Sequence, residues 1–396
     1  MYINEHWKNF EPIDRKWHYL IAFIYFVIGV FGLITNFMVF YYLLKIKSVK
    51  RPGTYFLINL AIADLGKILS CLPMNAVSSY YQKWIFGQLG CDIYGIAGGL
   101  FGFVSITTMV FMSIERYLMI KNPLFALKLT NRTVLFCILI TWLYSSLWIF
   151  PQLTLKNGFV LEGLLTSCTF DYLSRDSYSR LMIMFLFIGG FFIPLSLIGI
   201  FYILLFVFLK NNTIFRSYRE RGNLKTQTEL SIYFKTSDSS NKYLTMKLPN
   251  TNNLISSNSN ISKQSDSESI NTNSKYNSFI KREVKVAKSI ILIVAMFCIA
   301  WLPYAIMALL AQYIQEDYLI KYVTPFTTSL PAIFAKTSSI YNPILYTLSN
   351  KDCKAYFKML FCKKIFSFKQ KNTDPNGLKI IPSETRLYTN INRNNL

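Results

Sequence analysis

The chain has 396 residues, of which 52% are hydrophobic, 16% aromatic and 16% charged, with a mean hydropathy of +0.31 and a formal net charge of +22. Soluble globular proteins carry about 25% charged residues, so this composition excludes an ordinary soluble protein. Seven cysteines exclude a disulfide scaffold, and two histidines, His6 and His18, exclude a zinc-enzyme core.

Seven apolar segments are each long enough to cross a bilayer, which takes about 20 helical residues. Five of them contain no Asp, Glu, Lys or Arg, the second contains Asp64 and Lys67, and the seventh contains only Lys336. The first segment is too long for a signal peptide and lacks its cleavage site. We therefore expect an all-α bundle of seven transmembrane helices in the cell membrane. The segments are 19–44, 54–78, 93–114, 133–155, 181–209, 289–315 and 322–350.

The positive charge is confined to four connections, 45–53, 119–132, 210–282 and 350–396, with net charges of +4, +3, +7 and +7. They carry all but +1 of the total and alternate with near-neutral connections. The positive-inside rule makes their side cytoplasmic, so the N-terminus (1–18) is extracellular and the C-terminus cytoplasmic. The basic charge therefore predicts topology and contact with the lipid bilayer, and it does not indicate nucleic-acid binding.

Within the seven-helix domain (19–349), a stretch of about 211–280 is rich in Ser, Asn, Thr and Lys, which predicts a disordered cytoplasmic loop. After the last span, we expect 350–364 to form a short amphipathic eighth helix and 365–396 to form a disordered tail. Cys362 follows the amphipathic stretch and is a candidate for palmitoylation.

Lys336 lies in the middle of the seventh apolar segment, with uncharged residues for about 14 positions on each side. A lysine at that depth costs roughly 2.5–3.5 kcal/mol on insertion scales and marks a functional site. Two interpretations are open: a buried ion pair between helices, or a desolvated amine that captures a carbonyl as a Schiff base.

The sequence around Lys336 resembles the opsins, the retinal-binding members of the rhodopsin-like G-protein-coupled receptors. Residues 334–346 read FAKTSSIYNPILY, with the lysine seven positions before the proline of NPxxY. Residues 98–117, GGLFGFVSITTMVFMSIERY, resemble the third helix of rhabdomeric and melanopsin-type opsins, and 297–313 resemble an opsin sixth helix. The resemblance implies a light-sensing receptor with 11-cis-retinal bound covalently to Lys336, and not an enzyme.

The resemblance also implies how the chromophore is held. Glu162 lies six residues before Cys168, where rhabdomeric opsins carry the counter-ion of the Schiff base, and Tyr94 offers a hydrogen bond only. Trp301 and Tyr304 are expected to pack against the polyene. Cys91 and Cys168 lie at extracellular positions, where they are expected to form a disulfide.

At the cytoplasmic side, the resemblance implies a switch that releases helix six for a G protein. Glu115-Arg116-Tyr117 ends the third helix, and an ion pair between Arg116 and Glu283 would hold the sixth helix against it. A polar cluster is expected to couple the pocket to this switch. Its members are Asn36, Asp64 and Asn342, and Tyr202 and Tyr346 are expected to rearrange with it. Pro343, the proline of the NPxxY motif, is also expected to belong to the switch.

The implied partners are a heterotrimeric G protein, expected to be of the q class, together with arrestin and a receptor kinase. Two other functions are weighed: a retinal photoisomerase of the same fold, and a receptor for a diffusible ligand. The intact switch residues argue against the first and Lys336 against the second. Lys67 leaves two interpretations open: a local ion pair with Asp64, or a charge near the Schiff base that favours ultraviolet absorption.

Overall fold

The computed structural model describes residues 2–45, 52–122, 128–155, 158–211, 262–350 and 353–359, with backbone only for 262–279 and 281. Residues up to Ser349 form one compact unit, and those from Asn350 onward form a second unit, which is considered by itself below. Among the described residues, six helices are long and apolar enough to cross a membrane.

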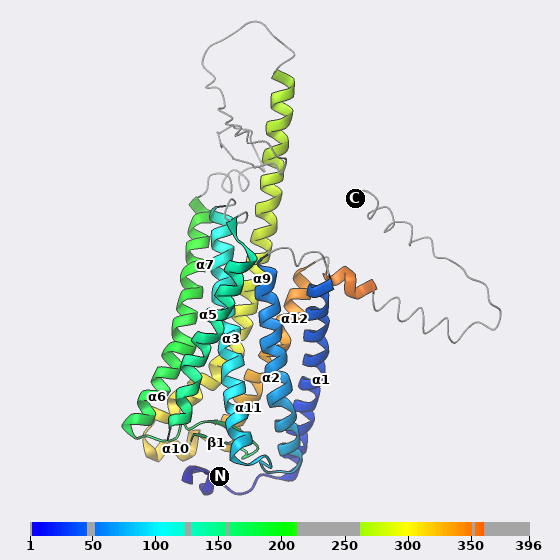
Figure 1. Ribbon diagram of the computed structural model, residues 1–396. Coiled ribbons are helices and arrows are strands. Elements are labelled where there is room, and N and C mark those ends of the chain that lie inside the picture. Colours follow the sequence, from blue (N-terminus) through cyan, green and yellow to red (C-terminus); the bar gives the residue numbers. More distant parts are fainter. Residues whose placement is uncertain are drawn as a thin grey trace, which may run out of the picture. The chain divides into compact units, whose positions relative to one another are not determined.

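The first unit is a bundle in which the long helices run side by side (Figure 1). The helix α3 contacts α2, α5, α7 and α9 as well as both strands, so it is the central helix. The α-helices of the bundle are α1 (Arg15–Lys45), α2 (Thr54–Tyr80), α3 (Gly87–Lys121), α5 (Asn131–Ile149), α6 (Ser177–Phe187), α7 (Ile193–Asn211), α9 (Ser262–Tyr313), α10 (Glu316–Tyr322), α11 (Pro325–Lys336) and α12 (Ser338–Ser349). The remaining elements are η1 (Glu5–Asn9), η3 (Phe150–Thr154), η4 (Ile188–Phe192), β1 (Phe159–Glu162) and β2 (Ser167–Phe170).

Side-chain burial follows the pattern of a membrane bundle. Large apolar side chains point outward on the spans, as at Phe23, Leu143 and Phe206, which are 63%, 63% and 67% exposed. Polar side chains such as Asn59 and Asp64 are buried instead. A soluble domain rarely exposes so much contiguous apolar surface, so the outer face of the bundle suits lipid.

The seventh span is two helices rather than one. Its first part, α11, begins at Pro325 and ends at Lys336, and α12 continues from Ser338. At the break, the backbone N–H of Thr337 donates to Phe334 O at 3.1 Å, three residues back rather than four. The predicted span of 322–350 is therefore divided directly after Lys336.

The helix α9 begins at Ser262, inside the segment that the sequence predicts to be disordered (about 211–280). The first residues of α9 are polar, so the helix starts well before the apolar segment at 289–315. The apolar pattern therefore places the start of this helix too late. Residues 212–261 of the predicted loop lie outside the described residues.

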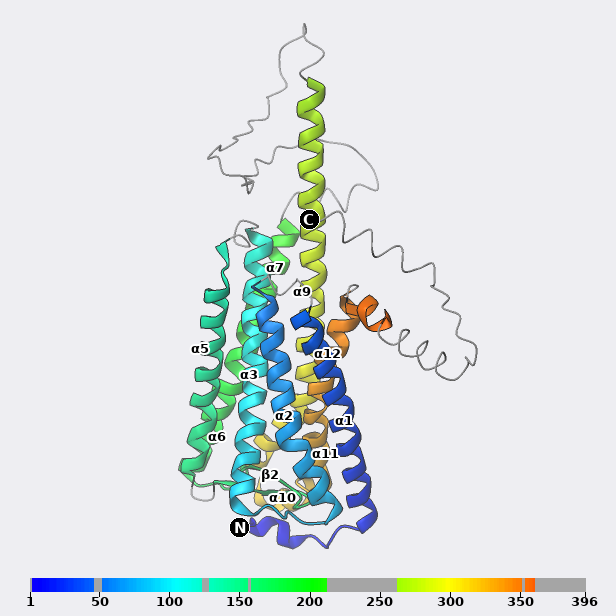
Figure 2. The same cartoon turned by 45° about the vertical axis from the view of Figure 1, so that its right-hand side comes forward.

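One end of the bundle carries the N-terminal segment, the two strands and α10, which lie together in both views (Figure 2). The strands form an antiparallel hairpin in which Leu161 pairs with Cys168. His6 Nε2 lies 2.6 Å from Val323 O, and this contact holds the N-terminal segment against the bundle. This is the end that the charge pattern predicts to be extracellular.

In the second unit, residues 353–359 are helical, and the Asn350 side chain accepts a hydrogen bond from Cys353 N at 3.1 Å. This helix falls within the predicted amphipathic helix at 350–364. Cys362 and the predicted disordered tail at 365–396 lie outside the described residues.

Candidate functional site

A cavity opens inside the bundle between α2, α3, α6, α9 and α11, and the hairpin of β1 and β2 covers it. Its wall is mostly apolar and aromatic, while its ionisable side chains include two lysines and one glutamate. Such a cavity suits an elongated apolar ligand with one reactive or charged end. The apolar wall includes Phe103, Ile149, Phe159, Phe170, Leu186, Phe187, Phe191, Trp301, Ala305, Ala332 and Ala335.

Lys336 lies at the last residue of α11 and lines this cavity. Its Nζ atom lies 5.5 Å from the ring centroid of Tyr94 and 5.9 Å from that of Tyr25. In the part of the chain that the structure describes, the amine forms no hydrogen bond and no ion pair. Of the two interpretations of Lys336, this arrangement favours an amine available to a ligand over a structural ion pair.

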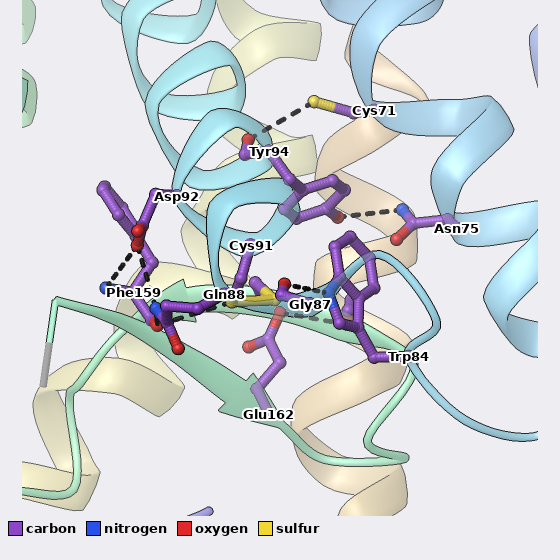
Figure 3. Close-up of a disulfide and its surroundings, with 12 residues drawn as sticks. Cys71, Asn75, Trp84, Gly87, Gln88, Cys91, Asp92, Tyr94, Phe159 and Glu162 are labelled. Atoms are coloured by element: carbon purple, nitrogen blue, oxygen red, sulfur yellow. Dashed lines mark hydrogen bonds between the residues drawn. A yellow bond between two sulfur atoms is a disulfide. The ribbon is translucent and has the colours of Figure 1, made fainter. Parts of the chain in front are cut away.

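Glu162 is the carboxylate that faces the same cavity, at the end of β1 and only 2% exposed (Figure 3). Its oxygens accept hydrogen bonds from Tyr304 at 3.2 Å, Ser167 at 3.4 Å and Tyr172 at 3.5 Å. Burial raises the pKa of Glu162, and the facing charge of Lys336 and these hydroxyl donors offset part of that rise. A positive charge at Lys336 therefore stabilises the carboxylate form of Glu162.

Tyr94 contributes its ring to the cavity and its hydroxyl to a neighbouring helix. The hydroxyl accepts a hydrogen bond from Asn75 Nδ2 of α2 at 2.9 Å (Figure 3). The ring thus faces Lys336 while the oxygen is occupied by Asn75.

A disulfide between Cys91 and Cys168 joins the start of α3 to β2, as the sequence predicts. It lies directly beside the cavity, and Figure 3 shows it above Glu162. Because β1 pairs with β2, the disulfide also fixes the strand that carries Glu162.

Replacing Cys168 with serine is expected to destabilise the protein by about 2–4 kcal/mol, since the disulfide closes a long loop. The measurement is thermal unfolding in detergent, and the matched control is Cys137→Ala, which removes a free thiol from α5. Equal unfolding temperatures for both variants would contradict this role.

Trp301 and Tyr304 line the cavity from α9, on either side of Pro303. The Trp301 ring stacks on Phe297, with centroids 5.8 Å apart and an interplanar angle of 28°. The Tyr304 hydroxyl bonds to Thr169 as well as to Glu162. The sixth helix therefore touches both the apolar wall and the carboxylate.

Far from the cavity, Arg116 of α3 holds Glu283 of α9. Arg116 Nη1 lies 2.5 Å from Glu283 Oε2, and its Nη2 lies 2.8 Å from Glu115 Oε2. Both carboxylates are about 95% buried, at 4% and 5% exposure, so solvent screens this pairing weakly. The structure therefore contains the predicted ion pair between the third and sixth helices.

A cluster of polar side chains lies between the cavity and this ion pair. Asn342 Nδ2 donates to Asp64 Oδ2 at 2.7 Å, which joins α12 to α2. Asn36 Nδ2 donates to Ser339 O at 2.8 Å, which joins α1 to α12. The structure therefore brings these three predicted residues together around the start of α12.

The remaining predicted switch residues lie on α3, α7 and α12. Tyr117 packs its ring against α7, and the Tyr202 hydroxyl donates to Ala287 O of α9 at 3.4 Å. Pro343 and Tyr346 lie in α12. The π-helical turn η4, which contains the cavity residue Phe191 and directly follows Phe187, is not predicted from the sequence.

For Lys67, the structure does not show the local ion pair with Asp64 that is one of its two interpretations. Its Nζ donates to Ser338 Oγ at 3.0 Å, and no ion pair with Asp64 is present among the described residues. The Lys67 side chain lines the cavity instead. The ultraviolet interpretation stays a hypothesis.

Two further residues of the site carry no signal in the sequence that would have identified them. Tyr172 lies beside Glu162, and Cys71 lies on the cavity wall.

Comparison with known proteins gives consistent similarities. Residues 35–346 match the sequence model of the family described as "7 transmembrane receptor (rhodopsin family)". The chain is 34% identical over 91% of its length to "Rhodopsin, GQ-coupled" of Mizuhopecten yessoensis, and 32% identical over 88% to rhodopsin of Enteroctopus dofleini. It spans 64% and 66% of the length of these two relatives.

A melanopsin of Branchiostoma belcheri is 31% identical over 84% of this chain and 41% of its own length. The fold is similar to that in the crystal structure of squid rhodopsin, with a TM-score of 0.73, 29% sequence identity and 97% of each chain covered.

Proposed function

Because this chain belongs to the opsin branch of the rhodopsin family of seven-transmembrane receptors, we propose that it is a light sensor that carries 11-cis-retinal on Lys336. As a member of this family it is a multi-pass membrane receptor and not an enzyme. One observation carries the proposal: among the described residues, the amine of Lys336 has no hydrogen-bond partner, and it lies in an apolar cavity that Glu162 also faces.

Retinal, attached through a Schiff base to Lys336, supplies a polyene that changes shape when it absorbs light. The residues of the chain do the rest. Glu162 places a negative charge in the cavity, and the hydroxyls of Tyr304 and Tyr172 orient its carboxylate. The aromatic wall excludes water, which strengthens the attraction between Glu162 and a positive charge at Lys336.

Trp301 lies where a change in ligand shape would press on the sixth helix. Two positions further on, Pro303 removes a backbone donor from the α9 ladder and favours a bend there. On the side proposed to be cytoplasmic, Arg116 holds α9 through Glu283. Release of this pair would let α9 move away from α3 and open a site for a G protein.

The q class of G protein is the proposed partner, because the relative from Mizuhopecten yessoensis is described as GQ-coupled. Arrestin and a receptor kinase are the further partners proposed from the family. Basic residues on the cytoplasmic connections suit both an anionic leaflet and an acidic partner surface.

The decisive experiment combines absorption with G-protein activation. The full chain is expressed, loaded with 11-cis-retinal, and measured before and after illumination, with nucleotide exchange on a q-class G protein as the second readout. We expect a light-dependent spectral change and light-dependent exchange. A spectral change with no exchange on G proteins of any class would favour the photoisomerase alternative, and the absence of a pigment would favour a diffusible ligand.

Replacing Glu283 with glutamine is expected to raise exchange in the dark about tenfold, which corresponds to about 1.4 kcal/mol lost from the resting state. The variant removes the charge that holds Arg116 to α9 while keeping the side-chain shape. Dark nucleotide exchange measures it, with Lys288→Gln on an exposed position of α9 as the control. Dark exchange that stays at the control level would show that this pair does not restrain the receptor.

A further inference from the structure

Lys67 is a second lysine on the wall of the cavity that contains Lys336, and the proposed light-sensing function gives it no role. It lies within α2 and is 3% exposed. A lysine at this position is costly in a membrane, so its ammonium group depends on specific partners inside the protein. Asp64, one helical turn away on α2, bonds instead to Asn342.

Ser338 joins Lys67 to Trp301. Lys67 Nζ donates to Ser338 Oγ at 3.0 Å, and Trp301 Nε1 donates to the same oxygen at 3.2 Å. The Ser338 hydroxyl donates onward to Ala335 O at 2.7 Å. A hydroxyl has one donor and two acceptor positions, so this arrangement uses all three. One oxygen at the break between α11 and α12 thereby connects α2 with α9.

Lys67 also contacts the indole directly, because its Nζ lies 5.5 Å from the Trp301 ring centroid. A cation within about 6 Å of an aromatic centroid is attracted to the ring face, most strongly for tryptophan and away from water. On another side, α3 approaches the indole at Gly102, where a Cβ atom would lie 3.3 Å from the ring. The indole is therefore held by Lys67, by Ser338 and by the close approach of α3.

We propose that Lys67 is a positioning residue that holds Trp301 in its resting arrangement until the ligand in the cavity changes shape. This inference rests on the proposed function. Any displacement of the indole breaks its contact with Lys67 and its bond to Ser338, so both interactions favour the resting state. Removing them shifts the population toward the active state without light, because a two-state equilibrium follows the free energy of either state.

Replacing Lys67 with methionine, which keeps the length and removes the charge, tests the proposal. We expect dark nucleotide exchange by the retinal-loaded receptor to rise about tenfold, with the level in light unchanged. Lys67→Arg retains the positive charge and the donors and is expected to stay within about twofold of the unaltered receptor. Ser338→Ala leaves the charge in place and is expected to give a smaller rise, about threefold.

The readout is the ratio of dark to light exchange, measured on full-length protein with its pigment quantified by absorption. A purely structural role for Lys67 would lower pigment yield and leave this ratio unchanged. A ratio that is unchanged in both Lys67→Met and Ser338→Ala overturns the inference. If Lys67→Met forms no pigment, the ratio in Ser338→Ala decides. Failure of the unaltered chain to form a pigment, or to respond to light, instead overturns the proposed function.

Discussion

Replacing Lys336 with alanine is expected to abolish the pigment completely. The amine is the attachment atom in the proposed function, and it lies on the cavity wall without a hydrogen bond among the described residues. The alanine side chain cannot form a covalent bond to an aldehyde, so only apolar contacts would hold the ligand. The loss is expected to be all-or-none in the spectrum, because the absorbing species depends on the bond itself.

The matched control for this variant is Lys67→Met, since Lys67 is the other lysine on the same cavity wall. Absorption spectra after loading with 11-cis-retinal measure pigment in each variant, and borohydride reduction followed by peptide mapping identifies the modified lysine. We expect label on Lys336 alone, and pigment in Lys67→Met. If pigment persists in Lys336→Ala and the label lies on Lys67, the attachment site is on α2 and our proposal is wrong.

Replacing Glu162 with glutamine is expected to lower the pKa of the Schiff base by about 1–3 units, because a facing carboxylate favours the protonated form by that amount. The protonated form absorbs at longer wavelength, so its absorption band disappears at lower pH in the variant. Because the variant lacks the negative charge that favours the protonated Schiff base, the Schiff base loses its proton at a lower pH. Glutamine keeps the size of the side chain and a hydrogen-bond acceptor for Tyr304.

An acid–base titration of the absorption band measures this shift, with Asp92→Asn as the control. Asp92 lies on α3 beside the same hairpin, and its carboxylate accepts hydrogen bonds from Gln88 and Phe159 instead of facing the cavity (Figure 3). The control is expected to titrate as the unaltered pigment does. A Glu162→Gln titration that matches the Asp92→Asn titration would remove Glu162 from the role of counter-ion.

Several features of this protein follow from the sequence because they depend on local or one-dimensional signals. The spans are readable because the bilayer demands long stretches without charge, and the orientation is readable from the basic connections. Lys336 is conspicuous because a single charge in such a stretch is costly. Cys91 and Cys168 are identified as a pair by their predicted extracellular positions, and the structure confirms the disulfide.

Other features depend on which side chains meet across helices, and a linear pattern does not contain that information. Asp64 and Lys67 are spaced for a local ion pair, yet Asp64 bonds Asn342 of α12 and Lys67 bonds Ser338. The break after Lys336 likewise depends on packing, because the apolar pattern runs through it without interruption.

The sequence by itself therefore determined the topology, the charge on each side of the membrane, and the single lysine at the centre of the seventh span. The resemblance implied Glu162 as the partner of that lysine, and only the tertiary structure shows what brings the carboxylate into the cavity. Glu162 reaches the cavity because a hairpin and a disulfide fold it inward, and Lys67 reaches Trp301 because α2, α9 and α12 meet at Ser338. The physical reason is that insertion energy depends on each segment alone, whereas a contact depends on two segments brought together by the whole fold.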